Sequence, residues 1–328
     1  MKVWYDAGTG KQFRFGTAIA TRLRKDGHEI VFTTRKHPDT TGLAKVLGEK
    51  PIVVGRYDPT SLFSRLDESS HRMLQFSKMF MDRPPEFAIS HQSVELSRFA
   101  FGLGVPVLTT ADTPHAEAVN RLTIPLSTIV LVSEAIPEHL YKKYGARKII
   151  RFVGVDEVAW VKQPEKSLPL DFKKPLIVVR QMETKAAYGL GKEDFTVEAA
   201  HELSSLGTVI FLPRYSRPKY KNVIVMDQFV DTAGLAGQAD LVVSVGGTIA
   251  REAALQGTPS IVIKQFGKIQ VNDYLSKKGF PLFTVEPSKV ASASQLNLGK
   301  KFDVEASLAE LENPVDIIAK IVAKKQFA

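Results

Sequence analysis

The chain has no cysteine, which excludes disulfide bonds, thiolate metal ligands and a cysteine nucleophile. No apolar run approaches the roughly 20 residues that span a bilayer. The first residues, MKVWYDAG, lack the long apolar segment of a signal peptide and instead resemble a strand. These absences lead us to expect a cytoplasmic protein.

Several catalytic motifs are missing as well. There is no H-E-x-x-H, which disfavours a zinc hydrolase, and no G-x-S-x-G, which disfavours a serine hydrolase. No two aspartates are spaced D-x-D, the carboxylate pair that a Mg²⁺-bridged nucleotide-sugar site usually needs. We therefore expect no metal and no cofactor. The absence of RNA-binding and zinc modules also disfavours nucleic acid as a partner.

The chain itself has 328 residues, with 44% hydrophobic and 24% charged residues, which is ordinary for a globular protein of two domains. Its formal net charge is +9. Anionic small molecules or an anionic membrane surface suit this charge, and a basic solvated surface explains it equally well. The oligomeric state is left open.

The first half of the chain alternates strands and helices. Apolar runs predict strands at residues 3–6, 29–34, 51–54, 87–90, 106–110 and 129–132, and helical spacing predicts helices at 13–25, 43–47, 60–82, 94–101 and 137–144. Phe15, Ile19 and Leu23 show the spacing of a buried helical stripe. This alternation is typical of a Rossmann-like domain with a parallel sheet.

A second alternating series follows a break. Residues 154–175 contain three prolines and several charges, and we interpret them as the interdomain connection. Beyond them we predict strands at 176–180, 208–212, 223–226, 241–245 and 260–263, and helices at 193–205, 248–256, 274–278 and 314–324. The expected fold is α/β with two Rossmann-like, doubly wound domains facing a central cleft. The domains are residues 1–160 and 161–328, with packing of the last helix on the first domain as an alternative.

The stretch from Leu241 to Ile263 contains a candidate phosphate site. A strand ends in Gly246-Gly247, and Thr248 then caps a helix that carries Glu252 one turn later. A helix that begins directly after a glycine pair presents free N–H groups and a partial positive charge to an anion. Glu252 is positioned to accept two sugar hydroxyls. An ordinary strand–helix turn with a surface glutamate is the alternative.

The first strand is followed by a second glycine loop, Gly8-Thr9-Gly10-Lys11. It matches neither G-x-x-x-x-G-K-[ST] nor G-x-G-x-x-G. Gly10, Lys11 and Arg14 nevertheless lie at a helix start beyond a strand's carboxyl end, where ligands of such sheets bind. We expect the loop to line the substrate site, although a plain turn would have the same pattern.

Five polar residues follow the strand at 106–110 within a short loop, and they are Asp112, His115, Glu117, Asn120 and Arg121. A carboxylate or imidazole can remove a proton from a hydroxyl, and the guanidinium can hold a phosphate. Asp112, His115 and Glu117 are therefore the candidate catalytic residues. The competing interpretation is that they cap and solvate the next helix.

Other candidates also follow strands. His91 comes directly after the strand at 87–90 and would face the same cleft, although a single histidine is often structural. Arg180 ends the strand at 176–180, with Glu183 and Tyr188 in the loop beyond it. An arginine there suits a diphosphate, whereas an ion pair with Glu183 is the alternative.

SVGGTIAREAALQGTPSI, residues 244–261, resembles the nucleotide-sugar segment of two-domain (GT-B) glycosyltransferases, particularly the lipid-linked N-acetylglucosamine transferases. HAEAVNRLT, residues 115–123, resembles the segment of UDP-N-acetylglucosamine 2-epimerases that places a glutamate shortly before Asn-Arg. Nearly the whole chain resembles the archaeal and bacterial DUF354 family of predicted glycosyltransferases. SHQSVELSRFAFGLGVPVL, DTPHAEAVNRLTIPL and RQMETKAAY carry that resemblance.

These resemblances imply a metal-independent glycosyltransferase of hexosyltransferase type. They assign the acceptor to the first domain and the nucleotide-sugar, a UDP-sugar, to the second. They imply that Glu252 binds the ribose. From the residue patterns above, we expect Arg180 and the Gly246–Thr248 helix start to bind the diphosphate, and Asp112 or His115 to act as the base. The acceptor is unknown, and a lipid-linked acceptor would bring the protein to the inner face of the membrane.

Two other functions stay open. An epimerase acting on UDP-N-acetylglucosamine is one, but the turn where epimerases carry an aspartate reads His91-Gln92-Ser93 here. A non-catalytic nucleotide-sugar binding protein is the other.

Overall fold

The computed structural model describes residues 1–162, 172–184, 191, 193–214, 220–226, 229–265, 267 and 269–325. The chain forms two compact units. The N-terminal unit comprises Met1–Trp160 and Glu312–Ala328, and the C-terminal unit comprises Val161–Leu311. The chain therefore returns to its first unit after completing the second.

A parallel sheet forms the centre of the N-terminal unit. In the described part of the chain its strand order is β3-β2-β1-β4-β5-β6-β7, and each neighbouring pair is parallel. The strands are β1 (Lys2–Ala7), β2 (Glu29–Lys36), β3 (Ile52–Arg56), β4 (Phe87–Ser90), β5 (Val107–Ala111), β6 (Ile129–Ser133) and β7 (Ile149–Phe152). The order reverses between β1 and β4, the switch point of a Rossmann-like sheet.

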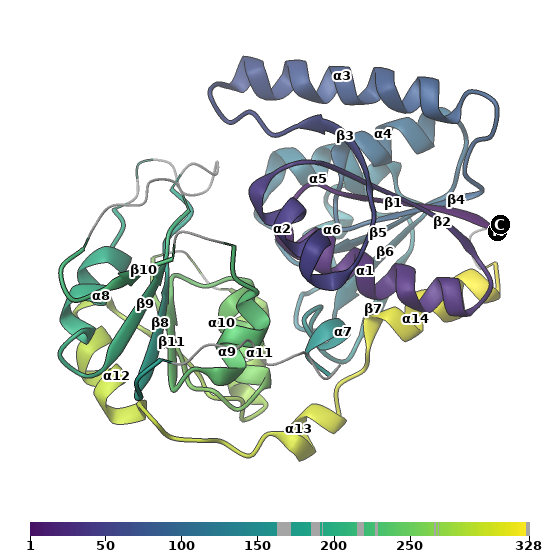
Figure 1. Ribbon diagram of the computed structural model, residues 1–328. Helices are drawn as coiled ribbons and strands as arrows, with labels where there is room; N and C mark the ends of the chain where they lie inside the picture. Colours follow the sequence, from purple (N-terminus) through teal and green to yellow (C-terminus); the bar gives the residue numbers. More distant parts are fainter. Residues whose placement is uncertain are drawn as a thin grey trace. The chain divides into compact units, whose positions relative to one another are not determined.

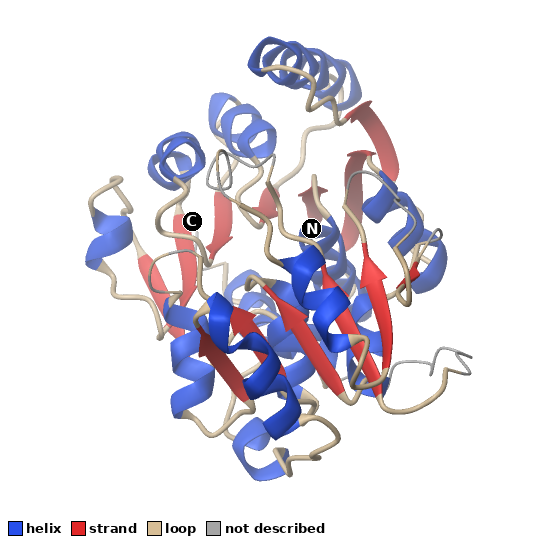
Figure 2. Cartoon of the chain, turned by 90° about the vertical axis from the view of Figure 1, so that its left-hand side faces the viewer, coloured by secondary structure: helices blue, strands red, loops and turns tan. Residues whose placement is uncertain are grey.

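Helices cover both faces of this sheet (Figures 1 and 2). They are α1 (Gly10–Lys25), α2 (Pro38–Leu47), α3 (Leu62–Phe80), α4 (Val94–Gly102), α5 (Glu117–Thr123), α6 (His139–Lys142), α7 (Val158–Val161) and α14 (Pro314–Ala323), with the 3-10 turn η1 (Ile124–Leu126). Figure 1 shows α3 and α4 on one side of the sheet, and α1 and α14 together on the other.

Each face has its own apolar core. On the α3 side, the ring of Trp4 lies with its centroid 4.8 Å from the rings of both Phe76 and Phe80. On the α1 side, the helical stripe predicted from sequence is confirmed, because Phe15, Ile19 and Leu23 are all buried.

The C-terminal unit repeats this plan. Its strands are β8 (Leu176–Arg180), β9 (Thr208–Leu212), β10 (Ile224–Val225), β11 (Leu241–Ser244), β12 (Ser260–Ile263) and β13 (Leu282–Val285). Among the described residues they follow the order β10-β9-β8-β11-β12-β13, again all parallel. Its helices are α8 (Thr196–Leu203), α9 (Thr232–Gln238), α10 (Thr248–Leu255), α11 (Gln270–Lys277), α12 (Val290–Asn297) and α13 (Glu305–Ala309), with the 3-10 turn η2 (Pro287–Lys289).

Alternate residues of β8 face two different helical layers. Ile177 and Val179 pack with the core below α8 and α12, while Val178 packs with that of α9 and α10. Figure 1 shows these helix pairs on opposite sides of the sheet. A strand buried on both faces reads as a continuous apolar run, which is why LIVVR was recognisable in the sequence.

The predicted connection at residues 154–175 is partly wrong. Val155, Val158 and Trp160 are buried in the N-terminal unit, because residues 154–160 continue its fold beyond β7. Residues 163–171 of that segment lie outside the described residues. Within the described ranges, none of the helices combines the length and apolar character needed to cross a membrane.

Candidate functional site

Loops after β1, β4, β5 and β7 bring four polar side chains to the carboxyl edge of the N-terminal sheet. Lys11 is the second residue of α1, directly after the β1 loop, and the other three loops carry His91, Asp112 and Asp156 respectively. Ligands of such sheets bind outside this edge, next to the point where the strand order reverses. The four side chains therefore lie where the fold favours a binding site.

Lys11 is the centre of this cluster. Its Nζ lies 2.5 Å from Oδ2 of Asp112 and 2.8 Å from Oδ2 of Asp156. Oε1 of Glu157, a residue only 1% exposed, lies 3.6 Å from the same nitrogen. One ammonium group thus faces three carboxylates.

His91 lies against the same carboxylates and is 7% exposed. Its Nδ1 is 2.8 Å from the hydroxyl of Thr110, and its Nε2 is 3.4 Å from Oδ1 of Asp112. Its carbonyl accepts a hydrogen bond from the side chain of Gln12, whose other end accepts from the backbone N–H of Gly8. The loops after β1 and β4 are therefore fastened together beside the cluster.

Tyr141, from α6, adds a buried phenol. Its side chain is fully buried, and among the described residues its hydroxyl has no hydrogen-bond partner. Burial raises the pKa of Tyr141 well above 10.0, and the charges of Asp112 and Asp156 raise it further. The phenol is therefore a neutral hydrogen-bond donor at physiological pH.

A metal ion would have to compete with Lys11. His91, Asp112 and Asp156 each offer one ligand atom within 4.8 Å of the other two, a donor set that suits a divalent cation. The ammonium of Lys11 already lies within 2.8 Å of both aspartates. The positive charge between these carboxylates is thus supplied by a side chain.

Of the other polar residues predicted after β5, some are exposed at the surface and one is buried within the loop. Glu117 and Arg121 are exposed and, among the described residues, form hydrogen bonds and ion pairs only with each other, at 2.8 Å. Asn120 is buried and donates to the carbonyls of Thr113 and Pro114. His115 is exposed in this loop. Catalytic roles for His115 and Glu117 stay predictions, as do binding roles for Asn120 and Arg121.

In the loop after β1, Gly10 is the first residue of α1. Arg14 lies one turn later and is only 4% exposed. Lys11 therefore belongs to the cluster, whereas Arg14 is a buried residue of the helix, and its contact with a substrate stays a prediction.

In the C-terminal unit, Gly246 and Gly247 form the turn between β11 and α10. Their φ angles are +107° and +98°, a region that only glycine adopts readily. The expected cap is wrong in detail: Gly247 occupies the N-cap position without a side-chain bond, and Thr248 is the first helical residue. The N–H groups at the start of α10 are therefore not capped by a threonine hydroxyl.

Glu252 is not a surface residue. It is 1% exposed, and its Oε2 accepts a hydrogen bond from the hydroxyl of Thr232, the first residue of α9, at 3.0 Å. The rest of α10 from Ile249 to Leu255 is buried too, because the helix packs against α9 and the sheet. The alternative interpretation, in which Glu252 is a surface residue, is therefore excluded.

A cavity of about 270 Å³ lies at the carboxyl edge of this sheet, directly beside the glycine turn. It is lined by Val245, Val262, Ile263, Lys264, Gln265, Gly267, Ile269, Asp273 and Thr284. A mixture of apolar side chains and a few polar groups is the usual lining of a small-molecule site.

Arg180 and Glu183 lie beyond β8. Arg180 is half-buried at the end of the strand. Glu183 pairs with Arg214, whose Nη1 is 3.3 Å from its Oε2. Arg214 also donates to the carbonyl of Gln181, so Arg214 joins the end of β9 to the loop after β8. Tyr188 lies outside the described residues.

Residues 1–326 match the family described as "Protein of unknown function (DUF354)". The chain belongs to this family. A similar protein is the uncharacterized protein MJ0665 of Methanocaldococcus jannaschii. It is 29% identical over 335 residues, with 97% of this chain and 96% of the relative covered.

Solved structures show that this DUF354 chain has the GT-B fold. The UDP-GlcNAc 2-epimerase of M. jannaschii, in complex with UDP-GlcNAc and UDP, is similar with a TM-score of 0.74 at 14% identity, covering 99% of this chain and 100% of that one. The glycosyltransferase SnogD from Streptomyces nogalater has a TM-score of 0.60 at 15% identity, covering 98% and 99%. At such identities the likeness concerns the fold.

Sequence reasoning missed Asp156, Glu157, Tyr141 and Thr232. Asp156 and Glu157 follow β7, whose residues, IIRF, are interrupted by an arginine and were not recognised as a strand. Had β7 been recognised, the pair would have stood at a strand's carboxyl end like the other candidates. Tyr141 and Thr232 had no comparable signal, since their roles depend on contacts across the fold.

Proposed function

We propose that this DUF354 protein is a metal-independent glycosyltransferase that moves a sugar, a hexose, from a UDP-sugar to an acceptor hydroxyl. The observation that carries the proposal is the turn at Gly246-Gly247. It opens α10 beside a cavity of about 270 Å³ and precedes the buried carboxylate of Glu252. The similar folds of glycosyltransferases and of an epimerase solved with UDP-GlcNAc and UDP support this class of ligand.

The donor would bind at the C-terminal unit. The start of α10 offers backbone N–H groups and a positive dipole end to the diphosphate. Arg180, at the end of β8, adds a cation for the same group. Glu252, held by Thr232, would accept the ribose hydroxyls. No divalent ion is then needed to neutralise the diphosphate.

The acceptor would react at the cluster of the N-terminal unit. Asp112 would take the proton of the acceptor hydroxyl, whose oxygen then bonds to the anomeric carbon. The bond from that carbon to the diphosphate breaks, and UDP leaves with the electron pair. Lys11, 2.5 Å from Oδ2, and His91, 3.4 Å from Oδ1, hold the Asp112 carboxylate in place.

One observation favours a second candidate, a UDP-N-acetylglucosamine 2-epimerase. Elimination and re-addition of UDP need several acid and base groups, and the sequence offered few. The structure places Asp156 and Glu157 beside Asp112, with Lys11 between them. This set of carboxylates weakens the argument against an epimerase.

Incubation with UDP-N-acetylglucosamine and no acceptor, followed by proton NMR, separates the two. A transferase leaves the sugar nucleotide unchanged and releases UDP only when a cell extract supplies the acceptor. Appearance of the 2-epimer would replace the transferase proposal with the epimerase.

The base is tested by Asp112→Asn, which keeps the shape of the side chain. General base catalysis contributes about 10²–10⁴-fold, so UDP release should fall by that factor. His115→Ala is the matched variant in the same loop and should retain most activity. Loss of turnover in His115→Ala alone would transfer the role of base to His115.

A further inference from the structure

Arg35 lies at the carboxyl end of β2, outside the cluster described above. Its Nε donates a hydrogen bond to the carbonyl of Gly8 at 2.7 Å, and its guanidinium carbon lies 4.4 Å from the ring centroid of Tyr57. A Cβ added to Gly8 would stand 3.4 Å from that carbon. The guanidinium is thus fixed between an aromatic ring and the loop that joins β1 to α1.

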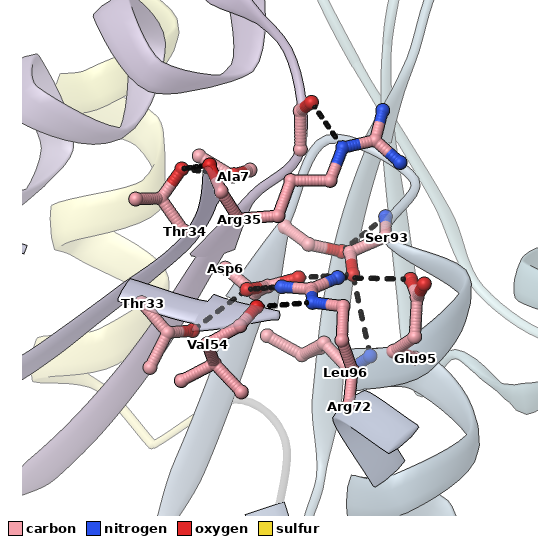
Figure 3. Close-up of polar contacts among 12 residues, drawn as sticks. Asp6, Ala7, Thr33, Thr34, Arg35, Val54, Arg72, Ser93, Glu95 and Leu96 are labelled. Atoms are coloured by element: carbon pink, nitrogen blue, oxygen red, sulfur yellow. Dashed lines mark hydrogen bonds and ion pairs between the residues drawn. The ribbon is translucent and has the colours of Figure 1, made fainter. Parts of the chain in front are cut away.

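The two Nη atoms of this guanidinium make no hydrogen bond to the described residues. Across the described residues, Nε is the only nitrogen of Arg35 that makes a hydrogen bond, and no ion pair is formed. Figure 3 shows both Nη atoms turned away from Asp6 and Arg72. Burial lowers the pKa of Arg35, and the charge of Arg72 adds to the effect. The free Nη donors of such a guanidinium can pair with an oxyanion through charge-assisted hydrogen bonds.

The carboxylates whose charges act on Arg35 are Glu95 and Asp6, and both are already engaged. Arg72 donates to Asp6 at 2.7 Å and pairs with Glu95 at 3.3 Å. Asp6 also accepts hydrogen bonds from Thr33 and Ser93, as Figure 3 shows. Together, Asp6, Glu95 and Arg72 carry one excess negative charge, which favours the charged form of Arg35. They do not use its Nη donors.

The position of these donors is suited to a ligand. Arg35 contacts the loop that leads into α1, a helix of 16 residues with no acidic residue in its first turn. The start of this helix contributes a positive dipole end. Asp39, from α2, lies beside this start, and its Cβ would lie 3.2 Å from a Cβ at Gly10. The three carboxylates that face Lys11 also lie near the first turn of α1. Parallel sheets of this type bind ligands at this edge.

We propose that Arg35 and the β1–α1 loop form a subsite for an oxyanion, a phosphate or carboxylate group, of the molecule that receives the sugar. That the anion belongs to a sugar acceptor rests on the proposed function. Binding of the anion itself does not. The two Nη atoms would donate side by side to two oxygens, the bidentate geometry for which arginine is suited.

The test is an NMR titration of the full-length protein, following the Nε–Hε signals of its arginines at constant ionic strength. One arm uses inorganic phosphate and the other uses acetate, with chloride as the reference. We expect saturable shifts of the Arg35 signal in at least one arm, and that arm identifies the group. Shifts no larger than with chloride in both arms would overturn the proposal.

Variants provide the second readout. Arg35→Gln should weaken anion binding at least tenfold, and Arg35→Lys should weaken it less, because it keeps the charge without the planar fork. Arg83→Gln removes one charge from an exposed arginine paired with Glu29 and should bind like the wild type. Equal weakening in Arg35→Gln and Arg83→Gln would show a nonspecific charge effect and refute the subsite.

A titration with UDP separates this inference from the proposed function. Arg35→Gln should bind UDP like the wild type, because its site lies in the other unit. If the wild type bound the anion but not UDP, the proposed function would fail and the anion subsite would stand. If the wild type bound UDP but not the anion, the anion subsite would be refuted and the proposed nucleotide-sugar site would stand.

Discussion

At the residue scale, the site depends on charges that the fold has brought together from separate loops. Lys11, His91 and Asp112 were predicted from sequence because each follows a recognisable strand. Asp156 was not, because β7 is short and contains Arg151. A site residue could therefore be predicted from the sequence only where the strand before it was recognised. Once the parallel strands are known, the topology places the residues that follow them at one edge of the sheet.

The phenol of Tyr141 gives the cluster a measurable pH dependence. Burial raises its pKa in the folded protein above 10.0, so the unfolded chain releases the proton first as the pH rises. The stabilisation is complete below a pH of about 10 and is lost as the pH rises toward the folded-state pKa. The free energy of unfolding, from urea titrations at about pH 8 to 11, should fall less steeply in Tyr141→Phe than in the wild type.

Tyr5 gives a parallel check. Its pKa is also raised well above 10.0, by burial first and then by Asp156 and Asp6. Tyr5→Phe should flatten the alkaline loss of stability in the same direction, and the double variant more than either. Identical slopes in the wild type and both variants would contradict the burial of these phenols beside the carboxylates.

At the element scale, the turn from β11 to α10 was the best predicted part of the chain. Its glycine pair and flanking strands were predicted correctly, because the residue types themselves favour these backbone conformations. The capping of α10 and the burial of Glu252 were not predicted correctly, since both depend on how α10 packs against α9. Local chemistry predicted the turn, and tertiary packing decided which side chains it exposes.

Gly247→Ala tests this turn. Its φ of +98° is strained for alanine, while the added Cβ would meet nothing within 4 Å, so the variant isolates backbone strain from steric clash. We expect a loss of about 1–3 kcal/mol in the free energy of unfolding. Gly267→Ala is the control, since Gly267 has open space and no such φ. Equal stability of the two variants would refute the turn geometry.

At the scale of the whole molecule, the chain forms two units of the same architecture and ends on the first. The alternation of strands and helices predicted that architecture. The return of the chain is less visible in the sequence, because α14 is an apolar helix that would suit the core of either unit. Ile318, Ile321 and Val322 are buried, and α14 packs along α1, with which it shares the ion pair between Arg22 and Asp316.

Calorimetric unfolding tests this division. Ile318→Ala, in α14, should cost about 2–5 kcal/mol and lower the transition of the N-terminal unit. Leu203→Ala, an equally buried position of α8, should do the same to the C-terminal unit. The two variants should affect different transitions, each matched to a unit by native-state hydrogen exchange. An effect of Ile318→Ala on the strands of the C-terminal unit would show that α14 is wrongly assigned.

The central claim, that the C-terminal unit binds a nucleotide-sugar at the turn before α10, is tested most directly by calorimetric titration with UDP. We predict saturable binding at one site. Glu252→Gln should weaken it by roughly 1.5–3 kcal/mol, or about 10- to 150-fold, because the ribose loses a charged hydrogen-bond partner. Glu202→Gln, an exposed glutamate of α8, should bind like the wild type. Absence of UDP binding to the wild type, or unchanged affinity in Glu252→Gln, would contradict the account.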